Sequence, residues 1–170
     1  MRKLTHRALV ALSVVLPATA LAQAPLSAED AFARLKSFAG SWQAPREGGG
    51  VIRLTYRVIS GDSALVESFT TPSGRETLSV YHLDGRRLLL THYCALGNQP
   101  RLRYAPETSG CDRLVFVFLD ATNLAAPEAE HMTRFEVTFV GPDRFDQTST
   151  YRQGGKEETT TLKLSRVPSG

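Results

Sequence analysis

The residue types best suited to chemistry lie in the middle of the chain, where His92 and Cys94 stand two positions apart. In an extended segment both share a face with Leu88 and Leu90, which favours an inward orientation. The imidazole could contact a ligand, or it could be a hydrogen-bonded part of the interior. A cysteine on an apolar strand face is more often a small core side chain than a nucleophile. We therefore treat both residues as candidate ligand contacts and assign no catalytic residue.

Six further polar residues are candidate ligand contacts: Asn98, Gln99, Arg101, Asp120, Asn123 and His131. The sequence Asn98-Gln99-Pro100 also suits a plain turn. Arg101 shares its strand face with Arg103, and on an outward face both would be solvated. On an inward face, Arg101 would have to meet a carboxylate or another anion, because an unpaired buried charge is costly.

Other chemistries are alternatives to ligand binding. His131 could join His92 and Cys94 around zinc or iron, although the sequence has no close paired spacing such as His-x-x-x-His. A Cys–His nucleophile pair needs an orienting group and an oxyanion hole, and no pattern specifies them. We predict no cofactor and favour a binding protein over an enzyme; an enzyme using His92 with Asp120 stays an alternative.

The elements that must position these side chains are mostly strands, because hydrophobic residues alternate with polar ones in runs such as 52–58, 134–139 and 161–165. Turn sequences rich in Gly, Asn, Asp and Pro separate the alternating runs, which is typical of an antiparallel sandwich or barrel. We expect ten strands, at residues 41–46, 51–59, 63–71, 76–83, 87–95, 100–106, 111–119, 132–140, 143–152 and 156–166. The only long connection expected is the loop 120–131.

One short helix is expected before the strands, at residues 28–38. Ser27 and Asp30 have capping-box spacing, and the apolar residues that follow have helical spacing. Gly40 is a suitable terminating residue.

The N-terminus has the pattern of a secretory signal peptide. Three basic residues, Arg2, Lys3 and Arg7, precede a short apolar run at 8–16 and the small-residue stretch 18–22. We expect cleavage after Ala22, export to a bacterial periplasm, and no membrane-spanning segment in the mature chain.

The mature part is expected to be a single domain, residues 23–170. The whole chain has 170 residues, 42% hydrophobic and 22% charged, which is ordinary globular usage. Removing the leader takes away 3 of the 20 basic residues and none of the 17 acidic ones, so the mature chain carries 17 of each. A near-neutral domain lacks the positive charge that attracts nucleic acid or anionic lipid, so we expect no nucleic-acid partner. It leaves the oligomeric state unpredicted.

The segment Phe38-Ala39-Gly40-Ser41-Trp42 resembles the Gly-x-Trp motif that opens the first strand of the calycins, the lipocalin and fatty-acid-binding-protein group. That resemblance implies an all-β, antiparallel up-and-down barrel of about ten strands with one short N-terminal helix. It also implies that Trp42 packs at the closed end beneath an arginine near the end of the last strand, and Arg166 stands at the matching place. An even number of strands returns the chain to the end where it began.

A second resemblance is more local. The segments Tyr56–Gly61, Val80–Gly85 and above all Thr91–Arg101 (THYCALGNQPR) resemble an uncharacterised family of exported, lipocalin-like bacterial proteins. This resemblance implies a fold and a location but no activity.

Counting strands from Trp42 places the eight candidate residues near the opposite, open end of the barrel. The mouth of a small barrel is the usual ligand entrance, so we predict binding of a small apolar or amphipathic molecule whose polar group is held at this rim. Ten-stranded haem-binding barrels of the nitrobindin type have the same strand number. Their ligating histidine lies near the C-terminus, whereas the last histidine here is His131, so haem stays an alternative. A fully packed barrel with an interaction role is another.

Two further expectations concern the interior. Residues 143–152 alternate so that either face brings polar atoms inward, which a hydrated cavity or the edge of a partly open barrel would accommodate. Cys94 and Cys111 fall at opposite ends of the barrel, on the order of 20 Å apart at ~3.3 Å per residue, so we predict two free thiols.

Overall fold

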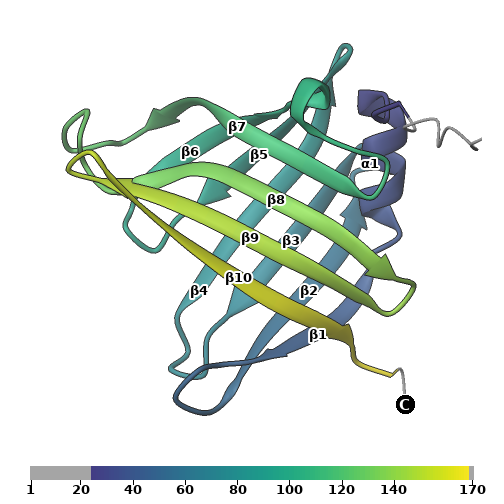
Figure 1. Cartoon of the computed structure of the whole chain (residues 1–170), viewed down its shortest axis with the longest axis horizontal. Coiled ribbons are helices and arrows are strands. Elements are labelled where there is room, and N and C mark those ends of the chain that lie inside the picture. The colour runs from purple at the N-terminus through teal and green to yellow at the C-terminus, as the bar shows by residue number, and fades with distance from the viewer. Residues whose placement is uncertain (1–23, 169–170) are drawn as a thin grey trace, which may run out of the picture.

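Ten antiparallel strands close into one barrel in the computed structural model, which describes residues 24–168 (Figure 1). Each strand pairs with its neighbours in the sequence, and β1 pairs with β10 to complete the ring. The elements run α1 (Ala28–Lys36), β1 (Gly40–Pro45), β2 (Val51–Ile59), β3 (Ala64–Thr70), β4 (Glu76–Asp84), β5 (Arg87–Tyr93), β6 (Gln99–Tyr104), the 3-10 turn η1 (Pro106–Thr108), β7 (Arg113–Thr122), β8 (His131–Gly141), β9 (Arg144–Gln153) and β10 (Lys156–Arg166). The predicted all-β barrel with one short helix is confirmed. The predicted signal peptide, residues 1–22, lies outside the described residues.

Every predicted strand overlaps an observed one. The largest difference is at the end of the seventh strand, because β7 runs on to Thr122, three residues past its predicted end. The alternation of hydrophobic and polar residues found these strands because one face of each packs in the barrel interior while the other meets solvent.

The helix α1 lies across one end of the barrel (Figure 1), where it contacts β2, β4 and β5. Its N-terminus is capped as predicted, since Ser27 Oγ accepts a hydrogen bond from the Asp30 backbone N–H at 3.0 Å. The helix buries Ala31, Phe32 and Leu35 against the barrel core. These apolar contacts close that end to solvent.

The predicted end of the helix is wrong by two residues. The helix stops at Lys36, with Ser37 as its C-cap, and Gly40 instead begins β1 with a φ of +124°. At Gly40 a Cβ atom would stand only 3.1 Å from Arg166 Nη1. The glycine is therefore needed for both the backbone conformation and the close approach of the arginine.

The closed end is built around Trp42, as the Gly-x-Trp resemblance implied. Trp42 pairs with Arg166 across β1 and β10, and the guanidinium carbon lies 4.2 Å from the centre of the indole ring. The same guanidinium donates to the carbonyl oxygens of Ser37 and Ala39 at 3.1 and 3.0 Å. Arg166 thus joins the last strand to the end of the helix.

Two irregularities in the strand pairing decide which side chains face inward near the open end. The register between β6 and β7 shifts at Arg101/Leu102, and that between β8 and β9 shifts between Met132 and Arg134. A β-bulge adds one residue to a strand and so changes which face the residues beyond it present. Thr133 is the extra residue in β8, because Met132 pairs with Tyr151 and Arg134 pairs with Thr150.

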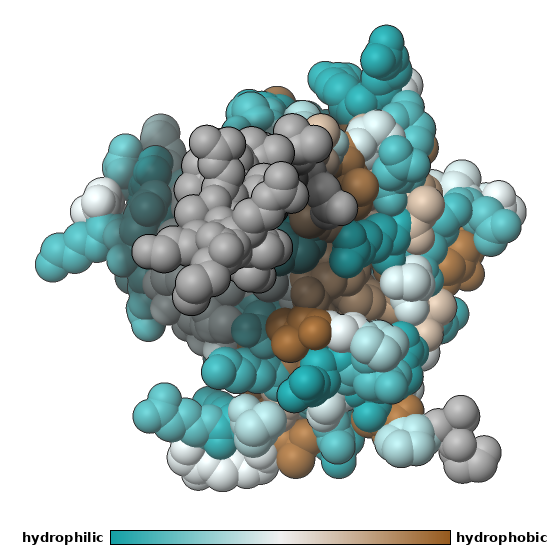
Figure 2. All heavy atoms as spheres, turned by 45° about the vertical axis from the view of Figure 1, so that its right-hand side comes forward, coloured by the Kyte–Doolittle hydropathy of each residue, from teal (hydrophilic) through white to brown (hydrophobic). Residues whose placement is uncertain are grey.

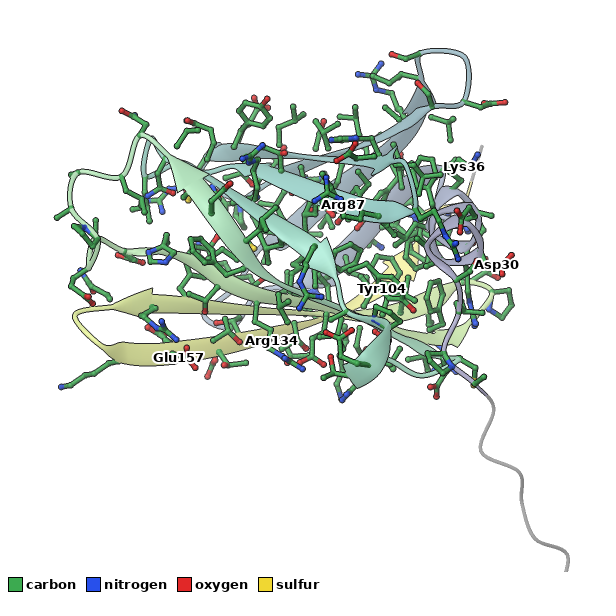
Figure 3. All side chains as sticks on the ribbon, turned by 90° about the horizontal axis from the view of Figure 1, so that it is seen from above. Asp30, Lys36, Arg87, Tyr104, Arg134 and Glu157 are labelled. Carbon is green, nitrogen blue, oxygen red and sulfur yellow. The ribbon has the colours of Figure 1, made fainter. Side chains whose placement is uncertain are left out.

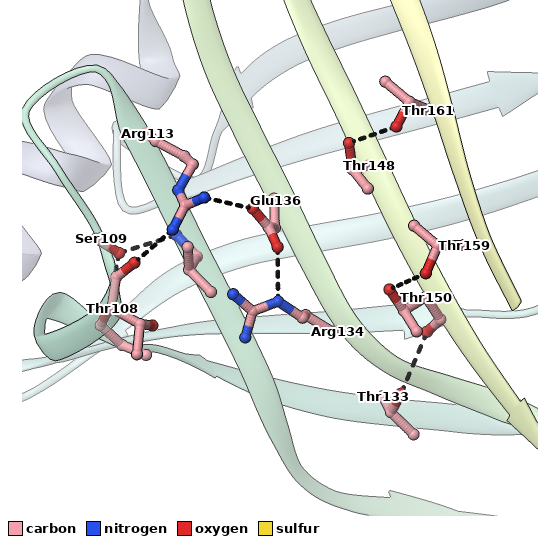
Figure 4. Close-up of polar contacts among 12 residues, drawn as sticks. Thr108, Ser109, Arg113, Thr133, Arg134, Glu136, Thr148, Thr150, Thr159 and Thr161 are labelled. Atoms are coloured by element: carbon pink, nitrogen blue, oxygen red, sulfur yellow. Dashed lines mark hydrogen bonds and ion pairs between the residues drawn. The ribbon is translucent and has the colours of Figure 1, made fainter. Parts of the chain in front are cut away.

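The outer face of β8, β9 and β10 is polar (Figure 4). Thr148 and Thr150 share hydrogen bonds with Thr161 and Thr159 across β9 and β10, at 2.9 and 3.0 Å. Glu136 pairs with Arg113 and Arg134 on the same face. On the side of the molecule shown in Figure 2, polar side chains predominate and hydrophobic ones form small separate groups.

Candidate ligand-binding cavity

A cavity of about 320 Å³ opens at the barrel end opposite α1. Figure 3 labels Lys36 on the helix at one end of the molecule and Glu157, at the start of β10, near the other. The mouth is formed by the turns around Thr71, Arg75 and Leu96 and by Glu130 before β8. The volume is at the lower end of the ~300–1,000 Å³ typical of small-molecule pockets.

The cavity wall has an apolar and a polar part. Ile52, Phe69, Met132, Phe135 and Leu162 contribute hydrophobic surface from four different strands. Six of the polar side chains come from β3, β4, β5 and β9: Glu67, Ser79, His92, Gln147, Ser149 and Tyr151. Such a wall suits a molecule with an apolar body and a polar group.

Glu67 is the centre of a buried hydrogen-bond cluster. Only 3% of its surface is exposed, and its Oε2 accepts hydrogen bonds from the hydroxyls of Tyr56 and Tyr81 at 2.7 and 2.8 Å. The side-chain amide of Gln147 donates to Glu67 Oε1 at 3.2 Å. Three strands, β2, β3 and β4, and the distant β9 therefore meet at one carboxyl group.

Burial raises the pKa of Glu67, although the hydrogen bonds from Tyr56, Tyr81 and Gln147 act in the opposite direction. Burial also raises the pKa of both tyrosines, and the neighbouring carboxylate adds to this effect. The tyrosines thus remain hydrogen-bond donors to Glu67.

Gln147 confirms that the ninth strand brings polar atoms to the interior. Its side chain is 4% exposed and lines the cavity, and its Oε1 has no hydrogen-bond partner in the protein. A closed barrel with a cavity, rather than an open sheet edge, accommodates this polar strand. A buried acceptor without a partner is costly, so a donor beside Gln147 Oε1 would be stabilising.

His92 lies between two hydroxyl groups on the cavity wall. Its Nδ1 is 3.0 Å from Ser79 Oγ and its Nε2 is 3.2 Å from Tyr151 Oη. Burial lowers the pKa of His92 to about 4, so the ring is neutral at neutral pH. A neutral imidazole held by two hydroxyls adds no positive charge to the cavity.

Cys94 also lines the cavity, two residues beyond His92 on the same face. Burial raises the pKa of the neighbouring Tyr151, with Cys94 as the second cause. Cys94 and Cys111 are both free thiols, as the strand order predicted.

Of the eight predicted site residues, His92 and Cys94 therefore line the cavity. Asn98 is buried near the mouth, where its amide nitrogen donates to the carbonyl oxygen of Glu130 at 2.8 Å. Gln99 and Asn123 both donate to the carbonyl oxygen of Gly97, at 3.0 and 2.6 Å. These three side chains stabilise the turns around the mouth.

The other three predicted residues lie outside the cavity wall. Arg101 faces outward and forms an ion pair with Asp120, so the solvated alternative holds for this strand face and His92 does not meet Asp120. His131 packs against the ring of Phe118, with the ring centres 4.9 Å apart, and its Nδ1 lies 2.6 Å from the carbonyl oxygen of Ala129. The bulge at Thr133 explains the position of His131, because it turns Met132 inward and His131 outward.

The sequence-based interpretation did not include Glu67, although a signal was present. Leu65, Glu67 and Phe69 share one face of the third strand, and the outer two residues are hydrophobic. A carboxylate at the middle of an inward-facing set indicates either an interior polar cluster or a ligand contact. Its partners could not be identified, because they lie 11 to 80 residues away in the sequence.

A second hollow, of about 300 Å³, lies between α1 and the turn after β8. Its charged side chain, Arg34, already donates to the carbonyl oxygen of Cys111 and lies 4.0 Å from the centre of the Phe139 ring. The open-end cavity is therefore the better candidate site.

Within residues 24–168, no three His, Cys, Asp or Glu side chains are grouped so that they could hold a metal ion. No helix in this part of the chain has the length and apolar character needed to cross a membrane. No protein-family model matches the chain, and no curated protein matches its sequence. The fold and the site thus define its class: a closed ten-stranded antiparallel barrel with an internal cavity open at one end.

Proposed function

We propose that the protein is an exported barrel that binds one small, amphipathic molecule inside its cavity. The observation that carries this proposal is the cavity itself, which is open at one end and combines hydrophobic walls with buried polar groups. The apolar body of the ligand would lie against Phe69, Phe135 and Leu162. Its polar group would meet His92, one of the residues that the sequence favoured, and the groups around Glu67, which the sequence-based interpretation did not include.

Two supporting arguments come from the sequence. The Gly-x-Trp motif and Arg166 resemble the calycins, many of which are ligand-binding barrels. Export to the periplasm rests on the signal-peptide pattern of residues 1–22. The mass of the chain recovered from a bacterial periplasm should correspond to residues 23–170, and recovery of the full-length mass from the cytoplasm alone would contradict export.

The binding proposal predicts that a bulky side chain inside the cavity blocks ligand uptake. Ser149→Phe places a ring on the inward face of β9, where Ser149 lines the cavity. We expect at least a tenfold loss of affinity, about 1.4 kcal/mol, for the neutral fluorescent probe N-phenyl-1-naphthylamine, measured by fluorescence titration.

The matched control is Thr148→Phe on the same strand. Thr148 faces outward and pairs with Thr161 (Figure 4), so this variant should bind the probe like the wild type. Equal affinities for the wild type and Ser149→Phe would mean that the probe binds elsewhere.

A further inference from the structure

The charge distribution in the cavity wall narrows the class of ligand, provided that the proposed function is correct. Glu67 and Glu130 are the acidic residues of the wall, and Arg75 at the mouth is its one arginine. His92 supplies no positive charge near neutral pH, because burial lowers its pKa to about 4. Burial raises the pKa of Glu67, and a cation beside it would favour the ionised form. With both carboxylates ionised, the wall carries two negative charges and one positive charge.

Glu67 lacks a cationic partner. None of the ion pairs formed within residues 24–168 includes it. Its three hydrogen-bond partners, Tyr56, Tyr81 and Gln147, are neutral donors. Buried carboxylates are normally paired with a cation, because burying an unpaired charge is costly.

The hydrogen-bond geometry leaves room for another donor. An ionised carboxylate has about four acceptor positions, and Glu67 uses two on Oε2 and one on Oε1. The unpartnered Oε1 of Gln147 adds an acceptor in the same part of the wall. Acceptors on these two neighbouring side chains suit a group that carries several N–H donors.

Aromatic side chains are the second feature of the cavity wall that favours a cationic ligand. Phe69, Phe135 and Tyr151 line the same cavity as Glu67. An ammonium group is attracted both by a carboxylate and by the faces of aromatic rings within about 6 Å.

We propose that the cavity binds a small organic ammonium ion, a primary amine with an apolar body, whose N–H groups donate to Glu67 and Gln147. The apolar body lies among Phe69, Phe135 and Leu162. A carboxylate ligand, which Arg75 at the mouth could attract, is the competing class and is an outcome of the test.

Three probes of similar shape separate these classes: 2-phenylethylamine, 2-phenylethanol and 3-phenylpropanoate, titrated calorimetrically at pH 7. We expect the amine to bind about tenfold or more tightly than the alcohol, as a charge-assisted hydrogen bond predicts. The carboxylate should bind more weakly than the alcohol. Equal binding of amine and alcohol, or tightest binding of the carboxylate, would overturn the proposal without any variant being needed.

Two variants then show whether the carboxylate of Glu67 causes the preference for the amine over the alcohol. Glu67→Gln should reduce the ratio of amine to alcohol affinity to near one, after circular dichroism has shown that it folds. Glu136→Gln removes a carboxylate from the outer face of β8 (Figure 4) and should leave the ratio unchanged. Persistence of the amine preference in Glu67→Gln would also overturn the proposal.

The outcomes for the ammonium class and for ligand binding in general are distinguishable. If N-phenyl-1-naphthylamine binds in the cavity but the amine has no advantage, the ammonium class is wrong and the binding function stands. If none of the four probes binds, both are wrong.

Discussion

Glu67→Ala should lower the free energy of unfolding by about 3 kcal/mol. The substitution leaves the hydroxyls of Tyr56 and Tyr81 and the amide of Gln147 without their common acceptor. Each buried donor that loses its partner costs about 1–3 kcal/mol, and loss of the disfavoured carboxylate offsets part of the total. Urea unfolding at pH 7, followed by tryptophan fluorescence, measures the difference.

Glu67→Gln is the matched control, because its amide oxygen can still accept from both tyrosines. Its stability relative to the wild type should depend on pH. Burial raises the pKa of Glu67 in the folded chain above the usual value of 4.5. The favourable contribution of the protonated carboxyl is fully present below that value and is lost as the pH rises through the raised pKa.

Glu67→Gln stays neutral throughout, so its stability should rise relative to the wild type between about pH 4.5 and neutrality. Unfolding of both proteins at pH 4.5 and pH 7.5 tests the sign. A difference that does not change with pH would show that the pKa of Glu67 is not raised in the folded chain.

Trp42→Ala should be the other strongly destabilising change, by about 3–5 kcal/mol, the range for removing a large aromatic side chain from a core. Trp42 is 1% exposed, and its indole N–H donates to the carbonyl oxygen of Phe38 at 2.7 Å. Its ring makes edge contacts with Phe38 and Phe145, with centres 5.5 and 4.7 Å apart. The substitution also removes the surface on which Arg166 stacks.

The prediction for Trp42→Ala is checked by thermal unfolding with a far-ultraviolet signal, since the chain has only one tryptophan. Tyr93→Ala is the control. Tyr93 is an aromatic residue of β5 that is 49% exposed, and its loss should change stability by less than about 0.5 kcal/mol. Similar losses of stability for the two substitutions would mean that the packing of Trp42 at the closed end does not stabilise the barrel.

The sequence predicted the barrel because its determinants are local or nearly so. Hydrophobic and polar residues that alternate at every second position indicate a half-buried strand, and glycine-rich turns indicate where the next strand begins. The capping of α1 by Ser27 depends on three residues of sequence. The contact of Trp42 with Arg166 was predictable only through the resemblance and the even strand count, because 124 residues separate the two.

The cavity wall was much harder to predict, for two physical reasons. The Glu67 cluster joins β3 to β9, which are not neighbouring strands. The contact of Gln147 with Glu67 can be recognised only when all ten strands have been placed in a closed barrel. In addition, the bulge at Thr133 reverses the inward and outward positions in the first residues of β8. Simple alternation from Phe135 would have placed His131 inward, whereas Met132 lines the cavity instead.

Arg101 and Asp120 illustrate the same difficulty from the other side. The strand count placed both near the open end, and the structure pairs them across β6 and β7. Being close to the mouth does not decide which face of a strand a residue occupies. A mutual ion pair on the outer face satisfies both charges, so neither is driven inward.

Binding inside the barrel is tested most directly by a nuclear magnetic resonance titration of the ¹⁵N-labelled chain with N-phenyl-1-naphthylamine. We predict saturable shifts of the backbone amides of Ser79, His92 and Ser149, which line the cavity, and little change at Arg101 and Asp120 on the outer face. Shifts confined to the outer face, or none at probe concentrations that saturate the fluorescence signal, would contradict a ligand-binding cavity.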